Sequence, residues 1–142
     1  MSEQTEDSLI LSANSVDLAG LKVLVVDDDP DSRDLVAFLL QEYGVEVIVV
    51  ASAVEVLKTL TTIQPDILVC DIGMPDMDGY MLMRQIRALP PEQGGQIPAI
   101  ALTAYAGESN QKLALNAGFQ CHLAKPVEPM DVISVIIELT QK

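Results

Sequence analysis

The chain of 142 residues is long enough for one domain with a buried core, and it contains no uncharged stretch long enough to cross a membrane. Its 21 acidic and 8 basic residues give a formal net charge of −13, which argues against direct binding to nucleic acid and favours cations and basic partners. Residues 1–19 are mostly polar and lack the features of a secretion signal. We therefore predict a flexible leader over 1–19, one domain over 20–142, and a cytoplasmic protein without membrane insertion.

After residue 20, short apolar runs alternate with amphipathic stretches, which is typical of βα units around a parallel sheet. The pattern predicts strands at 21–26, 45–50, 66–70, 97–102 and 119–123, and helices at 31–43, 53–63, 79–89, 108–117 and 128–141. Ser52 and Glu55 form a capping box at the second helix, and Gly44 and Gly118 stand where helices end. Five such units with right-handed crossovers predict an α/β, three-layer (βα)5 sandwich with the flavodoxin-like strand order 2-1-3-4-5.

Three carboxylates follow two of the predicted strands. Asp27 and Asp28 come directly after the first strand, and Asp71 comes directly after the third. In the order 2-1-3-4-5 these two strands are neighbours, and their carboxyl ends meet at the crevice where ligands bind in such sheets. Like charges this close repel one another, so a hard divalent cation with oxygen ligands, Mg²⁺ above all, is expected between them.

Two further polar side chains belong to the same edge of the sheet. Thr103 ends the fourth strand, and Lys125 follows the fifth. Phosphoryl transfer is mainly positioning and electrostatics, and it uses a divalent ion, a cation and hydrogen-bond donors around an in-line nucleophile. Asp71 can be that nucleophile, because carboxylates form aspartyl phosphates. The pattern therefore indicates that the Asp71 carboxylate becomes, or binds, a phosphoryl group.

Four segments together carry a resemblance to a known family: Val25-Val26-Asp27-Asp28-Asp29-Pro30, Asp71-Ile72-Gly73-Met74-Pro75-Asp76-Met77-Asp78-Gly79, Leu102-Thr103-Ala104 and Lys125-Pro126. Over about residues 21 to 140, the chain resembles the receiver domain of bacterial two-component response regulators. An acidic pair alone would be weak evidence, whereas these motifs in this order are specific.

The resemblance implies a role for each acidic position. Asp71 would accept a phosphoryl group from the phosphohistidine of a sensor histidine kinase or a phosphotransfer protein. Asp28 would bind Mg²⁺ directly and Asp27 chiefly through water, with Asp71 and the backbone carbonyl of Gly73 as further ligands. Mn²⁺ would be able to substitute for Mg²⁺.

The resemblance also implies a switch. Lys125 would pair first with Asp71 and then with the phosphoryl oxygens, and Thr103, with Ala104 beside it, would bind the phosphoryl group and move toward it. His122 stands where the family usually has Tyr or Phe as a rotamer switch, so this half of the switch departs from the family pattern. The Lys125–Pro126 peptide bond would be cis, which is uncommon for X–Pro bonds in general.

The last predicted helix has more apolar residues than one face needs. One stripe is expected to face the sheet, comprising Val132, Val135, Ile136 and Leu139. We expect the remaining apolar residues to widen the buried stripe; the alternative is that Ile133 and Ile137 are available to a homodimer or an output partner, together with strands 4 and 5. Whether the chain is a stand-alone receiver, a phosphorelay shuttle or part of a hybrid kinase stays open.

Two rival functions fit the sequence less well. A Mg²⁺-dependent aspartyl-phosphate phosphohydrolase would have a second acid two residues after the nucleophile, where this chain has Gly73. A flavodoxin-like cofactor binder would have a loop rich in Gly, Ser and Thr after the first strand, where this chain has acidic residues. The leading hypothesis is therefore a phosphorylated signalling switch that is not an enzyme in the ordinary sense.

Overall fold

The computed structural model describes residues 18–104 and 107–140. Its elements are β1 (Lys22–Val26), α2 (Pro30–Gln41), β2 (Glu46–Val50), α3 (Ala53–Ile63), β3 (Ile67–Asp71), α4 (Gly79–Arg87), η1 (Pro91–Gln93), β4 (Ala99–Thr103), α5 (Glu108–Ala117), β5 (Cys121–Ala124) and α6 (Pro129–Thr140). The strands form one parallel sheet in the order β2-β1-β3-β4-β5. The predicted fold class and strand order are therefore confirmed.

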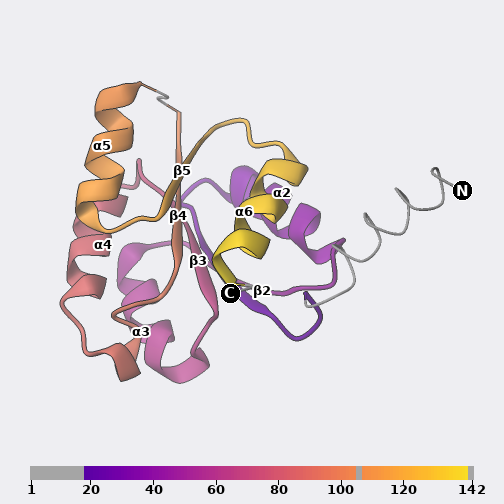
Figure 1. Ribbon diagram of the computed structural model, residues 1–142, viewed down its shortest axis with the longest axis horizontal. Helices are drawn as coiled ribbons and strands as arrows, with labels where there is room; N and C mark the ends of the chain where they lie inside the picture. The colour runs from indigo at the N-terminus through magenta and orange to yellow at the C-terminus, as the bar shows by residue number, and fades with distance from the viewer. Residues whose placement is uncertain (1–17, 105–106, 141–142) are drawn as a thin grey trace, which may run out of the picture.

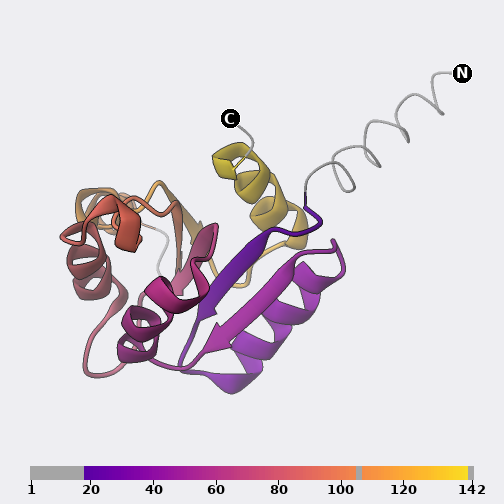
Figure 2. The ribbon, with the colours of Figure 1, turned by 90° about the horizontal axis from the view of Figure 1, so that it is seen from below.

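Helices cover both faces of the sheet, which gives three layers (Figures 1 and 2). α3, α4 and α5 lie on one face, over a core that includes Leu24, Leu68 and Leu82. α2 and α6 lie on the other face, over a core that includes Val23 and Ile100. Both faces of the central strands are thus buried, which explains why these strands are continuous apolar runs rather than alternating ones.

The ends of the elements follow local hydrogen bonds. The Ser52 hydroxyl accepts from the Glu55 N–H at 3.3 Å, as in the predicted capping box. Gly118 ends α5 with φ of 119°, a left-handed conformation that favours glycine. β5 begins at Cys121 rather than at the predicted 119, because the Phe119 N–H donates to a carbonyl of α5 and closes the helix end. The short turn η1 was not predicted.

The arrangement of α6 agrees with the wide buried stripe expected from the sequence. Ile133, which the alternative left available to a partner, is only 1% exposed and packs in the same core as Val132 and Ile136. Val135 and Ile137 are partly buried against that core. α6 therefore buries a wide apolar stripe, because it lies over the edge of the sheet beside α2 (Figure 1).

Of the predicted leader, only residues 18 and 19 belong to the described structure. Leu18 is 1% exposed and packs into the core under α2 and α6, so the core reaches back to this residue. Residues 1–17 lie outside the described residues, and their leader character stays a prediction.

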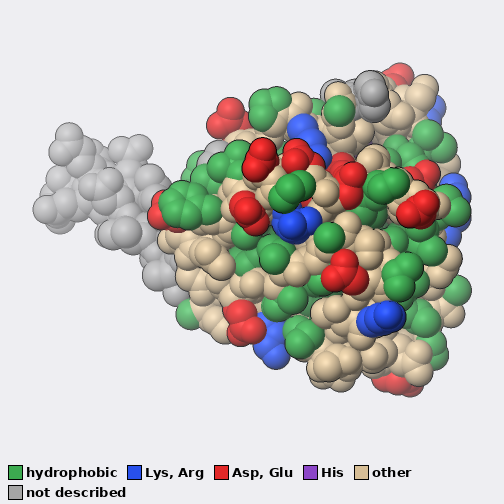
Figure 3. All heavy atoms as spheres, turned by 180° about the vertical axis from the view of Figure 1, so that it is seen from behind, with side chains coloured by type: hydrophobic (Ala, Val, Ile, Leu, Met, Phe, Trp, Pro, Cys, Tyr) green, Lys and Arg blue, Asp and Glu red, His purple; other side chains and the backbone are tan. Residues whose placement is uncertain are grey.

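None of the helices among the described residues has the length and apolar character to span a bilayer. Asp and Glu side chains gather around a few Lys and Arg side chains on the face in Figure 3.

Candidate functional site

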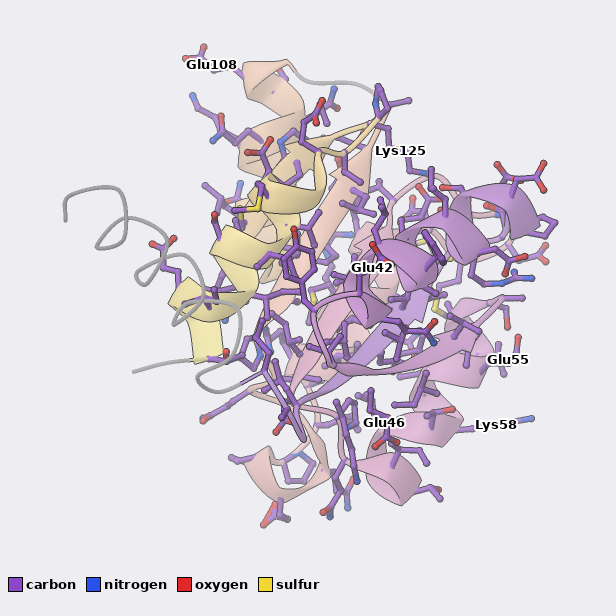
Figure 4. All side chains as sticks on the ribbon, turned by 90° about the vertical axis from the view of Figure 1, so that its right-hand side faces the viewer. Glu42, Glu46, Glu55, Lys58, Glu108 and Lys125 are labelled. Atoms are coloured by element: carbon purple, nitrogen blue, oxygen red, sulfur yellow. The ribbon has the colours of Figure 1, made fainter. Side chains whose placement is uncertain are left out.

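The register of the sheet brings the predicted polar residues to one edge. Val26 pairs with Cys70, so Asp27 and Asp71 come level at the ends of β1 and β3. Thr103 pairs with Ala124. Lys125 therefore follows directly beside Thr103, and its N–H donates to the Thr103 carbonyl at 2.8 Å. Figure 4 shows Lys125 at the end of the sheet where α5 begins, away from Glu46 at the start of β2.

The loop after β1 is shaped by the start of α2. Asp29 is the N-cap of α2 and accepts from the Asp31 N–H. The Asp29 N–H in turn donates to the Asp27 carboxylate at 3.0 Å. Arg33, one turn into α2, donates to the Asp27 backbone carbonyl at 2.9 Å. These bonds fix the backbone of the acidic pair before any ligand binds, and they leave Asp28 exposed beside it.

Lys125 joins two buried carboxylates. Its Nζ lies 3.1 Å from Asp27 Oδ2 and 3.1 Å from Asp71 Oδ1. Asp27 is 1% exposed and Asp71 is 6% exposed, whereas the Lys125 side chain is 26% exposed. The sequence suggested pairing of Lys125 with Asp71 alone, so the second pair, with Asp27, is an addition from the structure. One ammonium group thus balances part of the charge of two neighbouring acids.

The balance of charge shifts two pKa values. Burial and the negative charge of Asp27 raise the pKa of Asp71, and the nearby Lys125 offsets this only in part. Burial alone would lower the pKa of Lys125, but its hydrogen bond to Asp27 and the charge of Asp71 raise it overall. The site without a metal ion therefore holds a permanent cation and a carboxylate that ionises with difficulty.

The three acids fit a divalent cation. One carboxylate oxygen from each of Asp27, Asp28 and Asp71 can be chosen so that all three lie within 4.8 Å of one another. Hard oxygen donors in such a cluster suit Mg²⁺, which usually keeps several waters beside a few carboxylates. Gly73 lies in the same cavity, and its N–H is 3.4 Å from Asp71 Oδ1. The donor set is therefore compatible with the predicted metal site.

A cavity of about 430 Å³ opens beside Asp71. The predicted phosphate-binding residues Thr103, Ala104 and Lys125 line it, and Thr103 is 4% exposed. Tyr80 from α4 and Asn110 from α5 line it too. The sequence gave no signal for these two residues, because only the packing of α4 and α5 brings them to the site.

Two other sequence predictions concern β5 and its end. The Lys125–Pro126 peptide bond is cis. His122 is partly buried in the middle of β5, level with Ala101 of β4. Its Nε2 is buried, and no hydrogen-bond partner for this atom is present among the described residues. The structure therefore places His122 next to β4 but leaves its role as a rotamer switch a prediction.

Cys70 is a neighbour of Asp71 that takes no part in the chemistry. Its thiol is fully buried and donates to the Asp71 backbone carbonyl at 3.3 Å. Burial raises the pKa of Cys70 strongly, and the charges of Asp71 and Asp27 add to the effect. Because only the thiolate is a good nucleophile, Cys70 is inert and fills the core. Cys121, by contrast, is only partly buried.

Gly79 is required by the close approach of α4 to the Asp71 loop. A Cβ at Gly79 would lie 2.8 Å from Ile72 Cδ1 and 3.0 Å from the Asp71 carbonyl oxygen, whereas a Cβ at Gly73 would meet nothing within 4 Å. Gly79→Ala is expected to lower the free energy of unfolding by about 2 kcal/mol and to weaken Mg²⁺ binding. Gly73→Ala is expected to stay within about 0.5 kcal/mol of wild type. Urea unfolding and Mg²⁺ titration compare the two, and equal effects would contradict this account.

The raised pKa of Asp71 predicts a pH dependence in metal-free protein. Neutral Asp71 contributes stability that is fully present below about pH 4, which is the pKa of this carboxyl group in the unfolded chain. This stability is lost as the pH rises through the higher pKa that Asp71 has in the folded protein. Asp71→Asn stays neutral, so without metal it is expected to be more stable than wild type by about 1 kcal/mol at about pH 7, and the difference should shrink toward about pH 3. Urea unfolding in EDTA measures the difference. A difference that is independent of pH would contradict the prediction.

Comparison with known proteins agrees with this geometry. The fold and the cluster of acids and lysine define a flavodoxin-like protein with its site at the switch point between β1 and β3. Residues 23–137 match the model of the response regulator receiver domain family, so the chain belongs to that family. Receiver domains act as signalling switches in two-component systems.

The similar proteins include a structure with the metal in place. The receiver domain of a sensor histidine kinase from Pseudomonas aeruginosa, with a magnesium ion coordinated in the active site cleft, is 30% identical, has a TM-score of 0.79 and covers 87% of this chain and all of its own. An uncharacterized 14.6 kDa protein of Leptolyngbya boryana is 47% identical over 84% of this chain and 89% of its own length. The transcriptional regulatory protein CreB of Escherichia coli is 32% identical over 84% of this chain but only 51% of its own length.

Proposed function

We propose that the chain is a phosphoacceptor that receives a phosphoryl group on Asp71 from the phosphohistidine of a sensor histidine kinase or a phosphotransfer protein. In this reaction the bond between phosphorus and the histidine nitrogen breaks as a bond to an Asp71 oxygen forms. One observation carries the proposal: Asp71 shares Lys125 with buried Asp27 at the open end of the sheet, in a chain of the receiver family. A carboxylate held this way can attack phosphorus in line.

The same residues would hold the divalent ion. Asp28 would bind Mg²⁺ directly, Asp27 chiefly through water, and Asp71 and the Gly73 carbonyl would complete the protein ligands. When bound, the ion neutralises negative charge on the phosphoryl oxygens. Mn²⁺ is expected to substitute, because it also prefers oxygen ligands.

The phosphoryl group would be held by residues that already lie around the cavity. Lys125 would move its interaction from the Asp71 carboxylate to a phosphoryl oxygen while keeping its pair with Asp27. Thr103 and the backbone N–H of Ala104 would donate to the remaining oxygens. Movement of Thr103, coupled to a rotation of His122, would shift the protein between two conformations and change the surface over β4, β5 and α6.

The proposal extends to partners and location. The changed surface would bind an output partner or a second copy of the chain, and no direct binding to nucleic acid is expected. A cytoplasmic location would suit transfer from a histidine kinase. The free thiols of Cys70 and Cys121 are in keeping with a reducing compartment.

Stoichiometry tests the proposal against the phosphohydrolase alternative. The chain is incubated with Mg²⁺ and either acetyl phosphate or p-nitrophenyl phosphate, and both the intact mass and the release of nitrophenol are followed. We expect one phosphoryl group per chain from acetyl phosphate and no sustained release of nitrophenol. Repeated turnover of the phosphate monoester would favour the hydrolase, and absence of an adduct even with a phosphorylated histidine kinase would overturn the proposal.

A further inference from the structure

Tyr80 and Asn110, here called the gate pair, line the side of the cavity that the proposed function leaves unused. The cavity of about 430 Å³ is much larger than a phosphoryl group. It has room for roughly fourteen water molecules, at about 30 Å³ each. An aspartyl phosphate formed in such a space would be open to attack by water unless the walls restrict entry. The gate pair is the part of the wall contributed by the helices α4 and α5.

The position of Tyr80 is fixed by its neighbours at the start of α4. Asp78 caps α4 and accepts from the Met81 N–H at 2.9 Å. The Gly79 N–H donates to the Ile72 carbonyl at 2.9 Å, and the close packing of Gly79 leaves no room for a Cβ there. Tyr80 follows directly, so the position of its backbone is tied to the loop that carries Asp71.

Tyr80 also connects α4 to α5. Its ring is half-buried against the core, and its hydroxyl donates to the Asn110 carbonyl at 3.5 Å. Burial raises the pKa of Tyr80, and the charge of Asp78 adds to this, so the phenol keeps its proton and remains a donor. The N-cap of α5 is Gly107, which supplies no side-chain cap. The contact from Tyr80 thus links α4 to the first turn of α5 beside the cavity.

We propose that the gate pair controls access to Asp71, limiting both the entry of water to the aspartyl phosphate and the size of the phosphodonor that can reach the carboxylate. The inference rests on the proposed function. In the hydrolysis that the gate would slow, water attacks phosphorus and the bond between phosphorus and the Asp71 oxygen breaks. Asp71 leaves as a carboxylate, and the oxygen and both protons of the water leave with dihydrogen phosphate.

Two rates test the gate in the full chain with Mg²⁺: loss of the phosphoryl group, and uptake from benzoyl phosphate relative to the smaller acetyl phosphate. Tyr80→Ala should shorten the phosphate lifetime about tenfold and raise the benzoyl-to-acetyl ratio about tenfold. Tyr80→Phe, which keeps the ring and loses only the hydrogen bond, should shorten the lifetime about threefold. Met81→Ala is the control, because Met81 is the next residue of α4 and is exposed away from the cavity lining.

The outcomes separate the gate from the proposed function. A wild-type chain that takes up no phosphoryl group would overturn the proposed function and the inference with it. A phosphorylated wild type whose lifetime and donor ratio stay within about twofold in Tyr80→Ala would overturn the gate alone. Tyr80→Leu keeps the apolar contact with the core and is measured in parallel, so that a poorly folded Ala variant still leaves a decisive result. A general loss of stability would not change the donor ratio.

Discussion

Asp71→Asn is expected to lower phosphoryl uptake by about 10³-fold or more, whether the donor is acetyl phosphate or a histidine kinase. The amide that replaces the carboxylate has no nucleophilic oxygen of comparable strength, and the other acids of the site are held in different roles. Asp27 is committed to Lys125 and to the Asp29 N–H, and Asp28 lies exposed at its side. Intact mass spectrometry after incubation with Mg²⁺ and donor measures the loss.

A matched control stands in the same loop. Asp76 is exposed and has φ of 70°, a left-handed conformation that Asn adopts readily. Asp76→Asn therefore makes the same chemical change without touching the cavity, and it should be phosphorylated like wild type. Because Asp71→Asn is expected to be the more stable protein at neutral pH without metal, loss of folding would not explain its inactivity. Undiminished uptake by Asp71→Asn would place the acceptor elsewhere.

Lys125→Met is expected to destabilise the metal-free protein by about 2 kcal/mol. Without the ammonium group, the buried carboxylates of Asp27 and Asp71 repel each other with no cation between them. The value lies below that for a fully buried pair, because the Lys125 side chain is 26% exposed and water screens part of its charge. Mg²⁺ at a hundred times its dissociation constant should stabilise the variant by about 2.7 kcal/mol, which is more than the loss. Thermal and urea unfolding with EDTA and with Mg²⁺ measure both effects.

The same change at an exposed lysine controls for loss of charge in a chain of net charge −13. Lys112 lies on α5, exposed and outside the cavity lining. Lys112→Met should change the free energy of unfolding by less than about 0.5 kcal/mol and should leave the response to Mg²⁺ as in wild type. If Lys125→Met were as stable as Lys112→Met in EDTA, the ion pairs of Lys125 with Asp27 and Asp71 would not stabilise the metal-free protein.

The sheet and the polar residues of its edge could be predicted because both depend on local patterns. Buried parallel strands are continuous apolar runs, and a residue that follows such a run must lie at the carboxyl edge. Asp27, Asp71, Thr103 and Lys125 all follow this rule, and the observed register brings them together. The strand order was inferred from the repeated βα units rather than from any single residue, and it correctly made β1 and β3 neighbours.

The remaining features could not be predicted because they depend on how helices pack. A wide buried stripe on α6 was expected, but the choice between it and a free surface depends on the angle at which α6 lies over the sheet, which helical periodicity alone leaves open. Tyr80 and Asn110 reach the cavity from helices that are neighbours only in the fold. The pairing of Lys125 with Asp27 depends on distances below the precision of a sequence pattern. The glycine at position 79 is visible in the sequence, but the sequence does not show that Ile72 is the residue that approaches it closely.

Tandem mass spectrometry of the phosphorylated chain tests the central claim most directly. After incubation with Mg²⁺ and acetyl phosphate, the aspartyl phosphate is fragmented and the position of the phosphoryl group is mapped. The account predicts one phosphoryl group, on Asp71, that forms only with a divalent cation present. A phosphoryl group on His122 or on another acid would contradict it. So would a chain that forms no adduct and also fails to bind beryllofluoride with Mg²⁺.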